Sequence, residues 1–162
     1  MDFLKSLFYS SPPKAAGCIF TNGNLILAGY QPKGPYISGI GGSSNKDEPS
    51  IITAMREVVE ELLDINPCDN LLNHLEGLRY TRKIVNGSYT LFVYSFDDLS
   101  ILLQLVKNYN PKSDLYENFP LNVQDLVFNR RISNVEITHL CILPLKKVLK
   151  FDKYFISDLL IL

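Results

Sequence analysis

The 162-residue sequence has few cysteines, no long apolar run and no excess of charge of one sign. Its three cysteines, Cys18, Cys68 and Cys141, are far apart and form no CxxC pair, which argues against a disulfide framework or a zinc ribbon. No stretch of about 18 apolar residues occurs, and no positive leader precedes an apolar segment at the start, so we expect a cytoplasmic protein outside the membrane. The 17 acidic and 16 basic side chains nearly balance, which excludes a strongly basic protein that coats nucleic acid.

The overall amino-acid composition is that of a folded domain. Hydrophobic residues make up 46% of the chain and charged residues 20%, as in an ordinary globular protein. At about 100–200 residues per domain, the length predicts a single domain over residues 1–162. Residues 1–14 are expected to form an N-terminal extension, because the prolines at 12 and 13 stop the short amphipathic segment before them.

Two β-hairpins are predicted from Asn-Gly turns between β-forming segments. The first covers residues 15–30 and the second runs from Leu75 to Phe96. Residues 31–47 are rich in glycine, proline and serine, so they are expected to form a loop with a short strand at Tyr36–Ser38.

Apolar periodicity predicts a helix over Ile51–Leu63, and the leucine-rich residues 99–109 predict another. Residues 108–131 are expected to be a long loop insertion with one helical turn near Val123–Leu126. The remaining expectations are a strand at 136–143, a short helix start at 144–150 and a closing helix at 152–162. This arrangement predicts an α+β protein or a mixed-sheet α/β sandwich.

Three carboxylates share one face of the helix predicted at residues 51–63. Glu57, Glu60 and Glu61 stand at i, i+3 and i+4, while the apolar residues project to the opposite side. One interpretation is a solvated acidic face. The other is a site for a hard cation such as Mg²⁺ or Mn²⁺, which prefers oxygen ligands and bridges them to phosphates. The preceding Gly41-Gly42 would let the backbone approach such a phosphate, which favours the second interpretation.

The spacing of these residues resembles the signature box of the Nudix hydrolases. That box is written G-x5-E-x7-R-E-U-x-E-E-x-G-U, with U a bulky aliphatic residue, and residues 42–61 here match its first seven specified positions. Leu63 replaces the last glycine and Asp64 the last aliphatic residue, although Ile65 can take the aliphatic role if the helix runs one residue longer. Ser43 stands where a lysine often follows the paired glycines.

The resemblance implies an α/β/α sandwich with a mixed central sheet, and hydrolysis of a nucleoside diphosphate linked to another group X with Mg²⁺ or Mn²⁺. It implies metal ligation by Glu57, Glu60 and Glu61, with Glu57 as an alternative base for the attacking water. Glu57, Glu61 and Arg56 form the implied catalytic set, while Glu48 and Arg56 form a structural pair that orients the box. Gly42 is implied in close approach to substrate.

Some family members carry a further glutamate as general base outside the box, and the candidates here are Glu136 and Glu117. A surface position is the alternative for both. His139 lies in an apolar segment and is expected to be a packed or edge histidine rather than a ligand.

The residues that would bind substrate are less strongly indicated. The candidates for phosphate contacts are Arg79, Arg82 and Lys83, and those for stacking a base are Tyr30, Tyr36 and Tyr80. A basic path for RNA is conceivable along Arg130, Arg131, Lys146, Lys147, Lys150 and Lys153, which are equally consistent with a solvated surface. The substrate stays open between the 5′ cap of RNA (decapping), small nucleotides and dinucleoside polyphosphates. The cap is placed first because of the dispersed basic residues and the long loop at 108–131. A non-catalytic nucleotide-binding module is the alternative of another class.

Overall fold

The computed structural model describes residues 14–34 and 37–145. In chain order the elements are β1 (Ala15–Thr21), β2 (Leu25–Tyr30), β3 (Ile37–Ser38), β4 (Ile40–Ser43), α1 (Ser50–Leu63), α2 (Asp69–Glu76), β5 (Arg82–Asn86), β6 (Tyr89–Ser95), α3 (Phe96–Lys107), α4 (Val123–Phe128) and β7 (His139–Pro144). The N-terminal extension up to residue 13, Tyr36 and the closing helix predicted at 152–162 lie outside the described residues.

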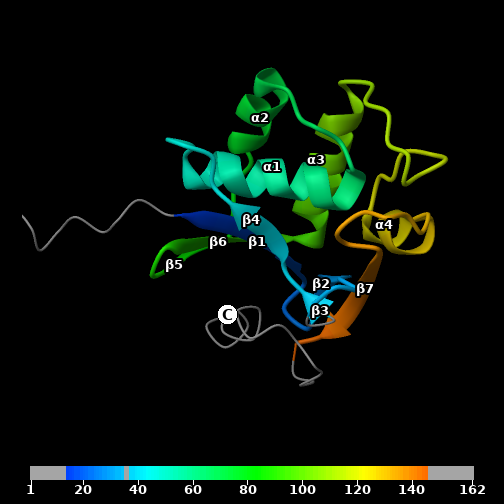
Figure 1. The fold of residues 1–162 in the computed structure, drawn as a ribbon, viewed down its shortest axis with the longest axis horizontal. Helices are drawn as coiled ribbons and strands as arrows, with labels where there is room; N and C mark the ends of the chain where they lie inside the picture. The colour runs from blue at the N-terminus through cyan, green and yellow to red at the C-terminus, as the bar shows by residue number, and fades with distance from the viewer. Residues whose placement is uncertain (1–13, 35–36, 146–162) are drawn as a thin grey trace, which may run out of the picture.

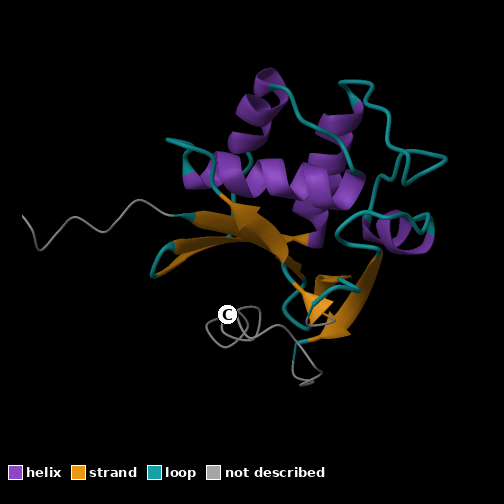
Figure 2. Cartoon of the chain, in the orientation of Figure 1, coloured by secondary structure: helices purple, strands orange, loops and turns teal. Residues whose placement is uncertain are grey.

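Within the described ranges the strands form one mixed sheet of seven strands. Its order is β3-β2-β1-β6-β5, with β4 paired to β1 and β7 paired to β2. Strands β1 and β6 are parallel, and the other pairs are antiparallel. Figures 1 and 2 show α1, α2 and α3 on one face of this sheet, with α4 beside β7. The predicted α/β class with a mixed sheet is therefore confirmed.

The main apolar core lies between the sheet and these helices. Along β1, the side chains of Ala16, Cys18 and Phe20 belong to this core, whereas Ile19 belongs to a second, smaller cluster. Successive side chains of a strand point to opposite faces, so the second cluster lies on the face away from α1. The sheet thus carries apolar side chains on both faces, as a sandwich requires.

Residues 40–43 were predicted as loop, and this prediction is wrong: they form β4. The first hairpin pairs at Thr21 and Ile26 near its turn, and the other end of β1 pairs with β4 from Ala15 to Cys18. Gly17 lies opposite Gly41 in this pairing, and a Cβ atom on Gly41 would come within 2.6 Å of the Gly17 Cα. The glycines therefore allow two strands to approach closely. From composition alone, the same glycines predict irregular backbone.

Three other boundaries differ from the predictions. Helix α2 was not predicted, and Leu75, expected to start the second hairpin, is buried within this helix. Helix α3 starts at Phe96 because the Ser95 hydroxyl accepts from the Asp98 N–H at 3.0 Å while the Asp98 carboxylate accepts from the Ser95 N–H at 2.8 Å. Strand β7 begins at His139 rather than at residue 136.

Among the helices of the described residues, none combines the length and the apolar character needed to cross a membrane.

Candidate active site

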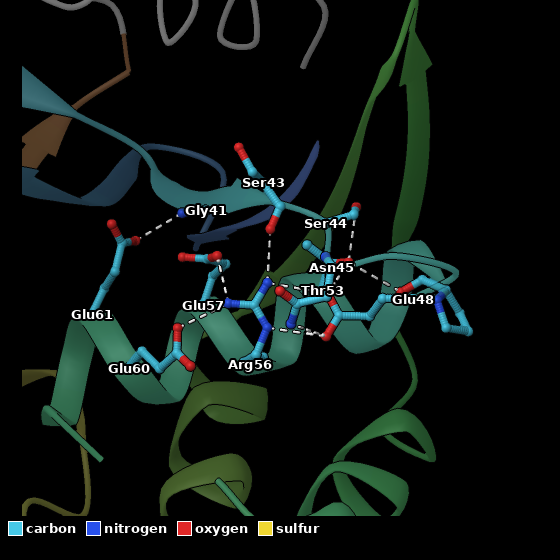
Figure 3. A network of polar contacts seen from close by, with 11 residues as sticks. Gly41, Ser43, Ser44, Asn45, Glu48, Thr53, Arg56, Glu57, Glu60 and Glu61 are labelled. Carbon is cyan, nitrogen blue, oxygen red and sulfur yellow. Dashed lines mark hydrogen bonds and ion pairs between the residues drawn. The ribbon is translucent and has the colours of Figure 1, made fainter. Parts of the chain in front are cut away.

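Helix α1 carries the acidic cluster and holds it over β4. The helix spans Ser50–Leu63, in agreement with its apolar periodicity. Its buried side chains are Thr53, Ala54, Met55, Val58, Val59, Leu62 and Leu63. Figure 3 shows the four charged side chains of the opposite face, those of Arg56, Glu57, Glu60 and Glu61, beneath β4. Packing of one helix face therefore fixes the position of the charged face.

Arg56 and Glu48, expected to form a structural pair, are in contact through two hydrogen bonds. Arg56 Nε donates to Glu48 Oε1 at 3.0 Å, and Arg56 Nη2 donates to Glu48 Oε2 at 3.1 Å. Nη2 also donates to the Ser43 carbonyl at 2.8 Å, at the end of β4. A bidentate guanidinium–carboxylate pair has a defined geometry, so it joins the residues before α1 to the middle of the helix.

Glu48 is held in its charged form by several donors. Burial alone would raise its pKa, but hydrogen bonds from Arg56, Thr53 and the Asn45 backbone N–H lower that pKa to about 2. Thr53 Oγ1 lies 2.7 Å from Glu48 Oε2, and Asn45 N lies 3.1 Å from the same atom. Thr53 was missed by the sequence analysis. A signal was present, since Thr53 is the polar residue on the apolar, fully buried face of α1.

The remaining nitrogen of Arg56 faces the acidic cluster. Nη1 donates to Glu57 Oε1 at 2.7 Å and to Glu60 Oε2 at 2.9 Å. The Glu57 side chain is only 14% exposed, compared with 35% for Glu60. Burial raises the pKa of Glu57; Arg56 opposes this effect, and the charges of Glu60 and Glu136 add to it.

Within the described part of the chain, Glu61 has no arginine partner and instead accepts a hydrogen bond from the backbone of β4. The Gly41 N–H donates to Glu61 Oε2 at 2.8 Å. Burial, together with the charges of Glu57, Glu136 and Glu60, raises the pKa of Glu61 to about 8, and the Gly41 hydrogen bond opposes only part of this shift. Among residues 14–34 and 37–145, Glu61 is therefore a buried acid without a compensating cation.

Gly42, expected to approach substrate, lies against the acidic cluster. A Cβ atom built on Gly42 would lie 2.5 Å from Glu57 Cδ and 2.6 Å from both carboxylate oxygens. Any other residue at this position would have to displace the Glu57 carboxylate. The glycine at the start of the box thus makes room for its second glutamate.

The structure separates the two candidates for a further acidic group. Glu136 lies close enough to raise the pKa of both Glu57 and Glu61, and its Oε1 accepts a hydrogen bond from Gln31 Nε2 at 3.1 Å. Glu117 pairs instead with Arg131 at 3.4 Å, and the two side chains are 81% and 55% exposed. The exposed Glu136 therefore acts on the cluster through its charge, and the contact of Glu117 is that of a surface carboxylate.

The two departures from the box alter how α1 ends. The helix continues through Leu63, which is buried, and Asp64 follows in a left-handed conformation with φ 53°. The Asp64 N–H donates to the Glu60 carbonyl at 2.8 Å, and Ile65 packs against the main core. The left-handed residue that usually closes a helix is therefore one position later than the glycine of the box.

The predicted phosphate-binding arginines are not brought to this cluster. Arg82 lies on β5, which β6 and β1 separate from β4. Ile84 packs into the second cluster, so Arg82, two residues earlier, faces the side away from α1. Arg79 is exposed in the connection between α2 and β5.

Other candidates have contacts of a structural kind. Lys83 Nζ lies 5.7 Å from the centre of the Phe92 ring, and the Tyr80 ring packs edge-on against Phe92 at 5.2 Å. His139 and Tyr30 form another edge-on pair at 5.9 Å, as expected for an edge histidine. The lysines at 146, 147, 150 and 153 lie outside the described residues, as does Tyr36.

The donor set suits a hard divalent cation in its chemistry. Glu57, Glu60, Glu61 and Glu136 would supply carboxylate oxygens, which Mg²⁺ and Mn²⁺ prefer. Within residues 14–34 and 37–145, however, no group of three metal-ligating side chains is arranged around a common point. The reason is visible in Figure 3: Arg56 Nη1 binds Glu57 and Glu60 together, and Glu61 turns to Gly41.

Comparison with known proteins gives distant structural similarity. No family model matches the sequence, and no curated protein matches it. A hydrolase of the NUDIX family from Clostridium perfringens is similar in structure at 15% identity and a TM-score of 0.44, with 92% of this chain and 94% of that chain covered.

A second similar structure is a bifunctional NMN adenylyltransferase/ADP ribose pyrophosphatase from Francisella tularensis, complexed with AMP and a Mn ion. The identity is 16% and the TM-score 0.47, with 97% of this chain covered. This chain spans only 44% of the bifunctional protein. Because identities and TM-scores are low, the α/β class rests on the mixed sheet itself.

Proposed function

We propose that this protein is a divalent-metal-dependent Nudix hydrolase that cleaves a pyrophosphate bond in a nucleoside diphosphate linked to a group X. The observation that carries the proposal is the acidic cluster of α1, in which Glu57, Glu60 and Glu61 share one helix face against β4. The box spacing and the hydrolases among the similar structures support the same proposal.

Each residue of the cluster has a role that follows from its contacts. Mg²⁺ or Mn²⁺, when bound, neutralises charge on phosphate oxygens and lowers the pKa of a bound water. Glu57, Glu60 and Glu61 would hold the ion, since they share one helix face and one guanidinium nitrogen of Arg56 bonds both Glu57 and Glu60 while Glu61 accepts from the Gly41 N–H. Arg56, held by Glu48, restrains Glu57 and Glu60 in the absence of the ion. Glu136 is the candidate base because its charge acts on both Glu57 and Glu61.

The described basic residues favour a small nucleotide over capped RNA as the substrate. Arg130, a member of the basic path considered for RNA, donates hydrogen bonds to the backbone carbonyls of Glu61, Leu62 and Ile137. Arg131 pairs with Glu117, and Arg82 faces away from α1. RNA decapping is therefore the second candidate, with the long loop at 108–131 and the C-terminal lysines as its remaining sequence features.

The test is hydrolysis of a substrate panel with Mg²⁺ or Mn²⁺. The panel contains nucleoside triphosphates, nucleotide sugars, dinucleoside polyphosphates and capped RNA. Glu61→Gln is the inactivating variant, and Glu117→Gln is the matched control because its carboxylate lies at the surface. Cleavage of one class that Glu61→Gln abolishes and Glu117→Gln preserves would establish the hydrolase. Metal binding without turnover of any substrate would instead indicate a binding module.

A further inference from the structure

The loop at 108–131 and the residues that follow it satisfy the C-terminal carbonyls of α1. The last four carbonyls of a helix have no partner within it. Here the Glu60 carbonyl accepts from the Asp64 N–H, and the Leu63 carbonyl accepts from the Ser113 hydroxyl. The two between them, those of Glu61 and Leu62, accept from the side chain of Arg130.

Arg130 uses both terminal nitrogens for this purpose. Nη1 donates to the Leu62 carbonyl at 2.6 Å and to the Tyr116 hydroxyl at 3.0 Å, and that hydroxyl lies 3.2 Å from the same carbonyl. Nη2 donates to the Glu61 carbonyl at 2.9 Å. A cation at this end of the helix is also favoured by the helix dipole.

The same nitrogen also contacts the segment that carries Glu136. Nη2 donates to the Ile137 carbonyl at 2.6 Å, so one atom joins the backbone of Glu61 to that of the residue after Glu136. The Ile137 side chain is buried against Gly29. A Cβ atom on Gly29 would lie 2.6 Å from Ile137 Cδ1. The Thr138 N–H donates to the Tyr30 carbonyl at 3.0 Å on the other side.

From this geometry we infer that Arg130 is a positioning residue that fixes Glu136 relative to Glu61, so that both carboxylates act on one divalent cation. The inference rests on the proposed function and names a residue outside the box through which the site is assembled. A lysine cannot reproduce the effect, because its single ammonium group lacks the planar fork that reaches several carbonyls at once.

The experiment measures Mn²⁺ affinity by the electron paramagnetic resonance signal of free Mn²⁺, without substrate. It compares the wild type, Arg130→Lys, Glu136→Gln and the double variant, with thermal unfolding to establish that each is folded. Ser113→Ala is the matched control, since it removes a bond to a neighbouring carbonyl of α1 but none to the Glu136 segment.

Arg130→Lys is expected to raise the Mn²⁺ dissociation constant on the order of tenfold, as for other residues that orient metal ligands. In the Glu136→Gln background, Arg130→Lys should change the Mn²⁺ dissociation constant by no more than about twofold, because Arg130 then has no Glu136 carboxylate to position. A change of that size is within the scatter seen for substitutions that do not interact. Ser113→Ala should leave the affinity unchanged. If Arg130→Lys does not fold, Tyr116→Phe replaces it. That variant removes the hydroxyl that accepts from Arg130 Nη1 and that also contacts the Leu62 and Leu126 carbonyls, so it loosens Arg130 and should weaken affinity only when Glu136 is present.

Two results would overturn the inference. One is an equal effect of Arg130→Lys with and without Glu136, which would mean that Arg130 only stabilises α1. The other is unchanged affinity in a folded Arg130→Lys protein. A wild type that neither binds Mn²⁺ nor hydrolyses the panel would instead contradict the proposed function.

Discussion

At the residue scale, the pKa values of two glutamates of the same site are shifted in opposite directions because their hydrogen-bond donors differ. Glu48 receives hydrogen bonds from Arg56, Thr53 and the Asn45 backbone, which hold its pKa at about 2. Glu61 receives one from Gly41, and burial raises its pKa to about 8. A carboxylate with a lowered pKa thus precedes α1, and a carboxylate with a raised pKa lies near the end of the helix.

Replacement of Glu61 by glutamine is expected to stabilise the metal-free protein at alkaline pH. The folded pKa of about 8 exceeds the ordinary value of 4.5, so folding takes up a proton between these values and wild-type stability falls as pH rises through this window. Glu61→Gln has no carboxyl group to titrate, so its stability does not fall in this way. Its free energy of unfolding should exceed that of the wild type by at least about 1 kcal/mol at the alkaline end of the window. Urea unfolding at both ends of the window measures the difference, which Mn²⁺ should reduce by stabilising the wild type alone. A constant difference at all pH values would contradict the assignment.

Gly42→Ala tests whether the Glu57 carboxylate needs the space above β4. Glycine to alanine in a compatible strand position is ordinarily neutral or stabilising, by up to about 1 kcal/mol. At residue 42, however, the methyl group would lie 2.5 Å from Glu57 Cδ and force the carboxylate to move. Mn²⁺ affinity and kcat/KM should fall on the order of tenfold or more, as for a displaced ligand.

The control for Gly42→Ala is Gly34→Ala. Gly34 is exposed, and the nearest atom to its added methyl group would be Gln31 Oε1 at 3.9 Å. This variant should bind Mn²⁺ as the wild type does. Wild-type affinity in Gly42→Ala as well would show that Glu57 functions from another position.

At the element scale, the position at which α1 ends determines where a glycine would stabilise the protein. Asp64 has the left-handed conformation that a glycine adopts without strain, so Asp64→Gly should stabilise the protein by about 0.5–1 kcal/mol. Leu63 is helical and 0% exposed, so Leu63→Gly, which restores the glycine of the box, should cost at least about 3 kcal/mol. Chemical denaturation of the two variants measures both signs. Stabilisation by Leu63→Gly would mean that α1 ends one residue earlier.

Periodicity and turn signals predicted the elements that depend on local sequence. Helix α1, the turn at Asn22–Gly23 and strand β6 follow directly from such patterns. Strand β4 could not be predicted, because its pairing depends on Gly17, distant in sequence, coming into contact with Gly41. The short helix α2 was missed because its eight residues give too few apolar repeats.

The candidate site also has contacts that the local sequence predicts and contacts that depend on the fold. The contacts of Glu48, Arg56 and the three glutamates of α1 are encoded within one segment, and their spacing indicated them. The role of Arg130 depends on a fold that brings residue 130 to the end of α1, 68 positions from Leu62. Its charge suggested nucleic acid, whereas three backbone carbonyls surround it.

At the scale of the whole molecule, the sheet separates the acidic cluster from several of the basic residues that the sequence offered for substrate. The cluster lies between α1 and β4, while Arg82 is three strands away, about 14 Å at ordinary strand spacing, and on the opposite face. Arg130 is committed to the backbone of α1. A long nucleic acid extending from the site would therefore meet few of these side chains.

This distribution predicts weak salt dependence of substrate use. A protein that neutralises several phosphates of an RNA chain loses affinity steeply between about 50 and 200 mM salt, with a slope of about 0.7 per phosphate for a single strand. A small nucleotide contacted through its pyrophosphate and a divalent cation involves few such charges. We expect kcat/KM for the hydrolysed substrate to change little over this range, and capped RNA to be no better a substrate than the isolated cap dinucleotide. A steep slope for capped RNA alone would instead place an RNA path on this protein and make decapping its activity.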